Sequence, residues 1–244
     1  MDLQSLNLSF QTFGTRLFTV ASANQEAEIA VCPGWNMKDL VSHVGTVYAT
    51  VESIISSGST ERPSDLFSSS PEGDVFNWAK GNFSSLLETL ERSEASHPVW
   101  TWGKEKNVGF YIRRMAHESL LRMRDAETVE NEHISIDGDI ACDGVDEYID
   151  VSLQLATSRK GFSYPDGSIH LHRTDGEGEW LLETVDSELL VKRAHEKGDV
   201  AVRGSALSLL LYLWGREPED IEIFGDPELA KMWSSLAPKH HAGG

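Results

Sequence analysis

The sequence is poor in cysteine and in positive charge. Only two cysteines, Cys32 and Cys142, occur in 244 residues, so we expect reduced thiols rather than a disulfide framework. Lys and Arg together number 21 against 39 Asp and Glu, which gives a formal net charge of −18. A chain this acidic repels the phosphates of nucleic acids and anionic membrane surfaces, and no local cluster of basic residues offsets the repulsion. We therefore expect neither nucleic acid nor a membrane as a partner.

Long hydrophobic runs are also missing. No segment reaches the roughly 18 uninterrupted apolar residues that a membrane-spanning helix requires. The opening residues begin with an acid and mix polar with apolar side chains, unlike a signal peptide, so we expect a cytoplasmic protein. The composition, 40% hydrophobic and 25% charged, is that of a globular protein, and the length favours two compact domains over one large domain.

The first half of the chain repeats apolar residues at intervals of three and four, the pattern of amphipathic helices. Asn36 is a suitable N-cap for the second of these helices. The expected helices run over residues 3–23, from 37 to about 55, from 75 to about 91, and from 109 to about 131. Together they predict a four-helix bundle over residues 1–150.

Beyond residue 150 the hydrophobic period changes to two. Alternating runs separated by glycine-rich or Asp-Ser connectors indicate antiparallel strands, followed by one more strand, an apolar helix, a turn at residues 224–227 and a short last helix. The expected strands lie around residues 168–173, 180–185, 189–193 and 199–204, with the apolar helix over 205–214. These elements predict a small mixed α/β domain over residues 151–238, and residues 239–244 a loose tail.

His43 and Glu118 are the first candidates for a functional site. His43 lies on the apolar stripe of the second helix, where an imidazole must be hydrogen-bonded, ligate an ion or stay neutral at some cost. Glu118 lies on the flank of the apolar stripe of the fourth helix, and Arg122 follows one turn later on the same face. A glutamate followed four residues later by a histidine would offer two ligands to one metal ion, but a guanidinium cannot ligate a cation. The alternatives are an ordinary Glu118–Arg122 salt bridge and a hydrogen-bonded core histidine.

Three further side chains lie near Glu118 in the sequence: His117, Asp125 and Glu127. His117 is rotated about 100° from Glu118 around the helix, so both residues would bind one ion only with distortion. Asp125 is an alternative ligand to complete an ion held by His43 and Glu118. Each of the three is therefore a secondary candidate.

The remaining histidines and Cys32 have weaker signals. His170 and His172 alternate on one expected strand and face the same side of the sheet, either as two imidazoles for a ligand or, more commonly, as a polar sheet face. Cys32 has no neighbouring base in the sequence and is expected to be structural. His240 and His241 in the tail are interpreted as a fortuitous pair.

Several motifs in both halves of the chain carry a family resemblance. Residues 32–43 are CPGWNMKDLVSH, residues 110–118 are FYIRRMAHE and residues 143–148 are DGVDEY. In the C-terminal half, IHLHRTD over 169–175 and DVAVRG over 199–204 continue the series. In this order the motifs resemble the mycothiol-dependent maleylpyruvate isomerase family. The resemblance implies a DinB-like four-helix, metal-binding bundle followed by a small α/β domain related in shape to sterol-carrier proteins.

The resemblance also implies a chemistry and its cofactors. In the family a divalent ion, usually zinc, is held by residues that match His43 and Glu118 and by a histidine four residues after the glutamate, and it activates the thiol of mycothiol. Here the third position is Arg122. The first hypothesis is a divergent member that acts on or binds a small anionic molecule, with Arg122 as a fixed positive charge and His43 or Glu118 as the base.

Two other hypotheses remain open. One is a metal-dependent mycothiol S-transferase or isomerase with the ion on His43 and Glu118, and the other is a binding or interaction protein without turnover. As an enzyme, the chain would be an isomerase, a lyase or a thiol S-transferase acting on a small-molecule substrate.

Overall fold

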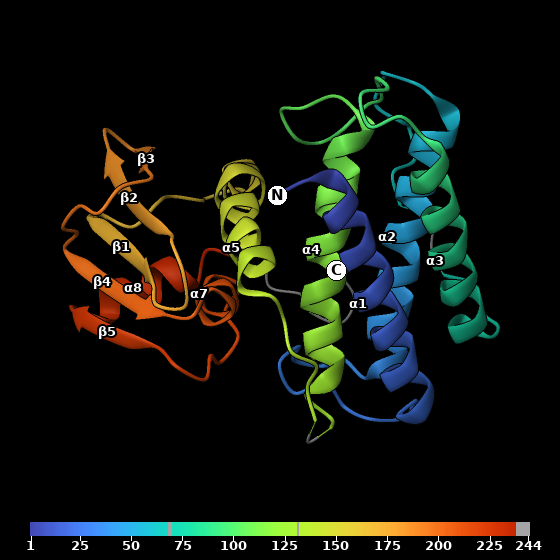
Figure 1. The fold of residues 1–244 in the computed structure, drawn as a ribbon, viewed down its shortest axis with the longest axis horizontal. Helices are drawn as coiled ribbons and strands as arrows, with labels where there is room; N and C mark the ends of the chain where they lie inside the picture. The colour runs from blue at the N-terminus through green and yellow to red at the C-terminus, as the bar shows by residue number, and fades with distance from the viewer. Residues whose placement is uncertain (68–69, 131, 238–244) are drawn as a thin grey trace. The chain divides into compact units, whose positions relative to one another are not determined.

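A computed structural model describes residues 1–67, 70–130 and 132–237. The chain forms two compact units, Met1–Ile134 and Ser135–Pro238 (Figure 1). The division that the sequence places at residue 150 falls inside the second unit, because residues 138–156 form helices that pack within that unit. The expected tail over 239–244, with His240 and His241, lies outside the described residues. Within the described residues, no helix is long and apolar enough to cross a membrane.

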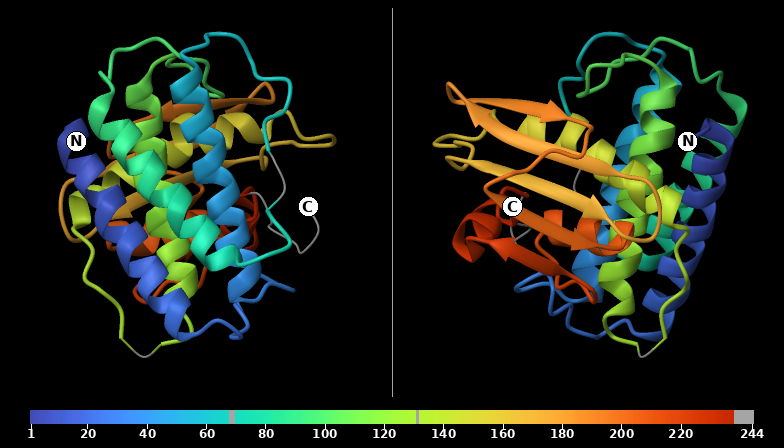
Figure 2. Two further views of the ribbon diagram at one scale, coloured as in Figure 1. Left: turned by 90° about the vertical axis from the view of Figure 1, so that its right-hand side faces the viewer. Right: turned by 60° about the vertical axis from the view of Figure 1, so that its left-hand side comes forward.

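The first unit is helical, as the apolar periodicity predicts. Each of its long helices begins at a side chain that accepts a hydrogen bond from a first-turn amide, which satisfies donors that the helix leaves open. Helix α1 packs along α4, and α2 packs along α3 (Figures 1 and 2). The helices and their caps are α1 (Leu3–Ala23, cap Asp2), α2 (Met37–Ser57, cap Asn36), α3 (Val75–Arg92, cap Asp74) and α4 (Val108–Glu127, cap Asn107).

Aromatic rings and close helix contacts form the interior of the bundle. The rings of Phe10, Tyr48 and Phe83 lie within 6 Å of one another, with centroid separations of 5.4, 5.2 and 5.9 Å. Gly45 of α2 lies against α3 so closely that an added Cβ would be 2.7 Å from the Ala79 Cβ. This contact holds α2 and α3 in a fixed relation along the bundle.

The second unit combines helices with a five-stranded sheet. The strand order is β3-β2-β1-β4-β5, with β1 and β4 parallel and the other neighbours antiparallel. The helical elements are α5 (Gly138–Glu147), a π-helical turn η1 (Tyr148–Ser152), α6 (Leu153–Ala156), α7 (Ala206–Leu213) and α8 (Pro227–Ser234). The strands are β1 (Ser168–Arg173), β2 (Glu179–Val185), β3 (Glu188–Lys192), β4 (Val200–Gly204) and β5 (Glu222–Gly225).

One pairing in this unit was not predicted, and one expectation was wrong. The runs expected as antiparallel strands, β1, β2 and β3, do pair antiparallel, but the sequence analysis predicts no direction for the next strand, and β4 pairs with β1 in parallel after the chain crosses over from β3. The segment around residues 224–227 was expected to be a turn, but Glu222–Gly225 extends as β5 along β4, and α8 starts directly after it. Period-two patterning reports which residues share a face and not the direction of the partner strand.

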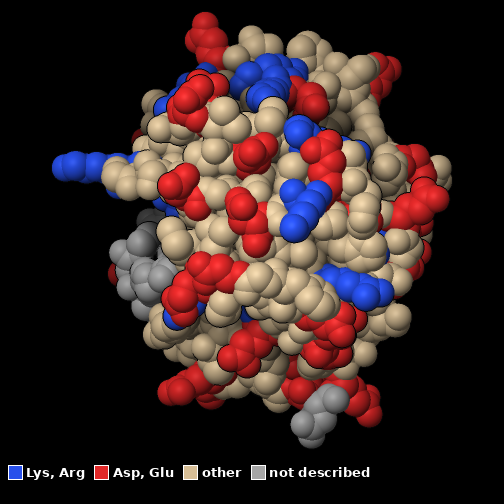
Figure 3. Space-filling model, turned by 90° about the vertical axis from the view of Figure 1, so that its left-hand side faces the viewer, with Lys and Arg blue, Asp and Glu red and all other residues tan. Residues whose placement is uncertain are grey.

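The two faces of this sheet differ in chemistry. Ile169 and Leu171 of β1 are fully buried, as are Leu182, Val200 and Val202, which lie opposite them or at matching positions on the neighbouring strands. Side chains alternate along a strand, so His170 and His172 lie on the other face. On the surface drawn in Figure 3, acidic side chains are numerous and basic side chains are scattered among them, in agreement with the net charge of −18.

Candidate functional site

The loop before α2 shapes one side of the candidate site. The Cys32 carbonyl accepts a hydrogen bond from the Trp35 amide at 2.9 Å, and Gly34 between them has a φ of 83°. Proline followed by a glycine with positive φ is the sequence of a type II turn, where a side chain at the glycine position would be strained. The turn places the Trp35 ring 5.3 Å from the His43 ring, at 51° between the planes.

Local capping fixes the start of α2 and therefore the direction of His43. Asn36 and Asp39 form a capping box in which each side chain accepts from the backbone amide of the other residue, both at 3.0 Å. His43 follows one turn later, and its side chain is 26% exposed. It is the candidate whose imidazole remains partly accessible, while the acidic candidates around it are buried.

The structure brings His43 and Glu118 together. The Nε2 atom of His43 lies 3.3 Å from Oε1 of Glu118, whose side chain is only 6% exposed. An ionised carboxylate only accepts hydrogen bonds, so this contact selects the imidazole form with a proton on Nε2. In the neutral form of that ring, the lone pair that can take up a proton is then on Nδ1.

Two arginines of α4 enclose the Glu118 carboxylate. Arg122, one turn after Glu118, donates from Nε to Glu118 Oε1 at 2.8 Å, and Arg114, one turn before it, donates from Nη2 to Oε2. Both oxygens of the carboxylate therefore accept from a guanidinium, and Oε1 also faces His43. Residues four apart on a helix share a face, so the three side chains lie in one row.

Arg122 is fully inside the bundle. Its side chain is 1% exposed, and its Nη1 donates to Asp125 Oδ2 at 2.9 Å in addition to the bond with Glu118. The thiol of Cys32 lies 3.6 Å from the same Asp125 oxygen. The guanidinium is thus shared between two buried carboxylates, and its charge is balanced locally.

These charges set the ionisation of the site. Burial alone would raise the pKa of Glu118, but the guanidinium groups of Arg122 and Arg114, with the hydrogen bond from His43, hold that pKa well below its ordinary value of 4.5. Burial would lower the pKa of Arg122, and Glu118 and Asp125 more than reverse the effect. The stable form at neutral pH is therefore a carboxylate between two guanidinium cations.

The secondary candidates on α4 are buried. His117 is 4% exposed and next to Glu118 in the chain, with the rotation that helical geometry requires. Glu127 is fully buried and accepts from Arg16 at 2.8 Å and from Arg124 at 2.7 Å. In the part of the chain that the structure describes, no three His, Cys, Asp or Glu side chains of the bundle gather closely enough to hold one metal ion.

Arg114 lies within the motif at residues 110–118, and the sequence analysis predicts no role for it. The available signal was its spacing: Arg114 precedes Glu118 by four residues, as Arg122 follows it by four. A carboxylate between two arginines at helical spacing is expected to receive both.

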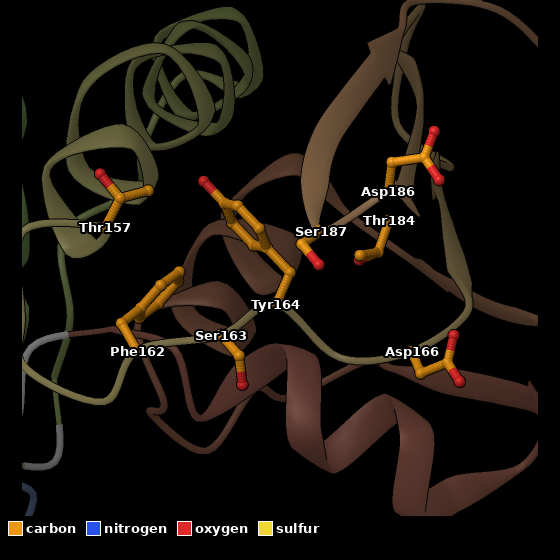
Figure 4. Close-up of a pocket in the computed structure, with 8 residues that line it drawn as sticks. All are labelled: Thr157, Phe162, Ser163, Tyr164, Asp166, Thr184, Asp186 and Ser187. Carbon is orange, nitrogen blue, oxygen red and sulfur yellow. The ribbon is translucent and has the colours of Figure 1, made fainter.

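A separate hollow lies in the second unit. It has a volume of about 520 Å³, and Figure 4 shows hydroxyl, phenyl and carboxylate side chains around it. The Phe162 and Tyr164 rings meet edge to face at 4.9 Å. Its lining residues are Thr157, Phe162, Ser163, Tyr164, Asp166, Thr184, Asp186 and Ser187. Its acidic groups, Asp166 and Asp186, would not attract an anionic ligand.

Comparison with known proteins supports the fold described above. Two solved structures, of the mycothiol-dependent maleylpyruvate isomerase and of its histidine-to-alanine mutant, each share the fold with a TM-score of 0.63 at 14% sequence identity, over 91% of this chain and 93% of theirs. No curated protein matches the sequence. The family model described as the mycothiol maleylpyruvate isomerase N-terminal domain matches residues 11–127, and the MDMPI C-terminal domain matches residues 139–231. With both of its domains matched in order, the chain belongs to the mycothiol-dependent maleylpyruvate isomerase family.

Proposed function

We propose that this chain is a divergent member of its family whose bundle site binds or transforms a small anionic molecule without a metal ion. The observation that carries the proposal is that both carboxylate oxygens of Glu118 already accept a hydrogen bond from a guanidinium group. The resemblance assigns the divalent ion to His43, Glu118 and the position of Arg122. In this chain that third position carries a donor instead of a ligand.

The residues present do not suit a divalent cation. Zinc binds a carboxylate oxygen at about 2.0–2.2 Å, and Arg122 Nε already lies 2.8 Å from Oε1. A divalent ion about 4 Å from a guanidinium would be opposed by about 8 kcal/mol at an effective dielectric constant of about 20, twice the value for two single charges. Arg114 on the other oxygen adds a second repulsion of the same sign.

In this proposal the arginines hold Glu118 in place, and His43 is the residue that reacts with the substrate. Arg122 is inaccessible and paired with two carboxylates, so we assign it the task of holding Glu118 ionised and in place, rather than direct contact with a ligand. Glu118 in turn orients His43 through Nε2. The partly exposed imidazole takes up or releases a proton at Nδ1, which suits an isomerase or a lyase that moves a proton on its substrate.

The class of ligand follows from the family. Its solved members are named for maleylpyruvate, a small dianion, and an imidazolium at His43 would attract such a molecule by charge. We therefore propose maleylpyruvate and related small dicarboxylates as the first compounds to test.

The runner-up function is metal-dependent thiol chemistry with mycothiol. Family membership supports mycothiol as the thiol, and the 3.3 Å contact between His43 and Glu118 keeps two of the three ligand positions of the resemblance together. This function requires Arg122 and Arg114 to leave the carboxylate.

Metal analysis of untagged protein, purified without added metal or chelator, separates the two functions. The zinc bound in the bundle is measured as the zinc content of the wild type minus that of the His43→Ala variant. We expect this difference to be zero. Stoichiometric zinc that disappears with His43→Ala would overturn the proposal. Binding of maleylpyruvate, measured by calorimetry in the presence of a chelator, should weaken at least about tenfold in His43→Gln.

Arg122→His provides a gain-of-function test. It removes the repelling charge and places an imidazole four residues after Glu118, so bundle-bound zinc should appear in this variant. Arg92→His is the matched control: Arg92 pairs with Glu88 at the same i,i+4 spacing on the surface, with a side chain 78% exposed, and no zinc should accompany that change. Equal zinc in wild type and Arg122→His would contradict the idea that the arginine excludes the ion.

A further inference from the structure

A second group of histidines lies on the polar face of the C-terminal sheet. His170 and His172 are on β1, and Glu179 at the start of β2 is directly opposite His172 in the register. His195 comes from residues 193–199, the crossover between β3 and β4. Elements that are separate in sequence therefore converge, and the sequence had indicated only the two histidines of β1.

One carboxylate receives all three imidazoles. Glu179 Oε1 lies 2.6 Å from His172 Nδ1 and 3.0 Å from His195 Nδ1, and Oε2 contacts His170 Nε2. The three rings are 5.2–6.0 Å apart and cross at 66–88° instead of stacking. Each ring thus directs a nitrogen at the same small region, whereas a merely solvated polar face would direct its nitrogens towards water.

The spacing is close to that of a metal centre. One ligand atom from each of the four residues lies within 4.8 Å of all the others, and in the described residues this is the one such group. A tetrahedral zinc ion with bonds of about 2.0–2.1 Å separates its ligand atoms by about 3.3 Å. The more distant ligand atoms must therefore approach one another by up to about 1.5 Å, and the hydrogen-bonded pairs at 2.6 and 3.0 Å must separate slightly. His195, 77% exposed on the crossover, has the freedom to do this.

The surrounding charges do not oppose a cation as they do in the bundle. The side chains that contact the Glu179 carboxylate are the imidazoles of His170, His172 and His195, and imidazoles become ligands on losing a proton. The cation opposite His172 on β4 is Arg203, and it lies 3.9 Å from Glu222 in an exposed pair. The contrast with Glu118 is chemical: that carboxylate faces permanent cations, and Glu179 faces potential ligands.

We propose that His170, His172, Glu179 and His195 bind one divalent transition-metal ion, with zinc as the best match to three imidazoles and one carboxylate. Four protein ligands fill a tetrahedral site, so the ion is structural and has no open position for a substrate. It fastens the β3–β4 crossover to β1 and β2. This inference does not depend on the proposed function of the bundle.

Titration of zinc into the full-length protein, after a chelator has removed any bound metal and has itself been removed, tests the site. All proteins carry His240→Ala and His241→Ala, which remove two imidazoles whose placement is not described. Calorimetry should give one equivalent of zinc, and cobalt(II) in its place should give the intense visible absorption of a tetrahedral complex. His172→Ala and Glu179→Gln should each lower the zinc affinity at least about tenfold.

Two further variants keep the test decisive. His195→Ala removes the most exposed ligand and should weaken zinc binding. The metal-free form of this variant should keep the thermal unfolding temperature of the metal-free wild type. His133→Ala, an exposed histidine of the first unit, should leave zinc affinity unchanged. Failure of the chelated wild type to bind zinc, or equal binding by all variants, would overturn the site. Zinc lost only in His43→Ala would overturn both this site and the metal-free bundle.

Discussion

Removal of the Arg122 guanidinium is the most informative perturbation of the bundle site. Arg122→Met keeps the length and apolar stem of the side chain and deletes its charge and hydrogen bonds. Two carboxylates, Glu118 and Asp125, then lose donors at 2.8 and 2.9 Å inside a bundle where both are at most 6% exposed. The stability lost in this variant measures how much the shared guanidinium cation contributes to the stability of the bundle.

The expected cost follows from the buried charges left behind. Deleting one partner of a buried ion pair destabilises a protein by about 3–5 kcal/mol, because the remaining charge stays desolvated. Glu118 keeps Arg114 and His43 as partners, and the Cys32 thiol stays next to Asp125, so we expect a loss near the lower end of this range. Arg122→Met with Asp125→Asn removes the buried charge together with its partner, and we expect it to recover more than half of the lost stability.

The loss should also depend on pH in a definite direction. In the wild type the folded-state pKa of Glu118 lies below the unfolded value near 4.5, so its ionisation stabilises the fold above that pH, and the stabilisation is lost as the pH falls through the folded pKa. Without Arg122 one of the groups that lower the pKa of Glu118 is lost, so its folded-state pKa moves upward from the wild-type value. The difference between variant and wild type should therefore be largest at pH 7 and should shrink as the pH falls below 4.5.

Hydrogen exchange of α4 peptides, followed by mass spectrometry, measures this stability without assuming that the two units unfold together. Arg92→Met is the control, because its salt bridge is exposed and should contribute at most about 1 kcal/mol. A loss in Arg122→Met no greater than in Arg92→Met, or a difference independent of pH, would refute the buried-cation account.

Three other predictions concern the rest of the chain. Acidification of the wild type below pH 4.5 should lower the protection factors of the amides in α2 and α4, because Glu118 must take up a proton that its folded pKa resists; protection factors that stay constant in both helices would contradict this. Gly45→Ala should destabilise the bundle by about 1–3 kcal/mol, since its Cβ would meet Ala79, whereas Gly81→Ala, with nothing within 4 Å, should be neutral or stabilising by up to about 1 kcal/mol in chemical denaturation. Duplex DNA should not bind at physiological salt, and a salt-sensitive micromolar affinity by fluorescence anisotropy would disprove the argument from charge.

Much of the fold follows from local patterns in the sequence. Apolar spacing and caps such as Asn36 located the helices of the bundle to within a few residues, because both signals act within one or two turns. The parallel partner of β1 and the strand at Glu222–Gly225 did not follow. Strand direction depends on how the chain returns to the sheet, which alternation does not encode.

The sequence predicted which residues of the bundle meet at the candidate site better than it predicted the hydrogen bonds between them. The juxtaposition of His43 and Glu118 followed from two apolar stripes that face the same interior. The guanidinium of Arg114 on the second oxygen was missed, and so was the approach of Asp125 to Arg122, since rotamer choice and burial select among several helical neighbours. On the sheet, Glu179 and His195 were missed because register and a crossover bring them to β1, and neither is visible in spacing along the chain.

The central place of β1 has a consequence for the newly made chain. β2 follows β1 after the short connection 174–178, and β3 follows at once, so these three strands can pair as soon as they are available. The second partner, β4, closes a parallel ladder over a much longer loop, and such contacts form late. Until residues 200–204 are synthesised, one side of β1 is an edge with unpaired backbone groups, which readily joins strands of other molecules. Premature termination in the crossover would therefore yield a product prone to aggregation.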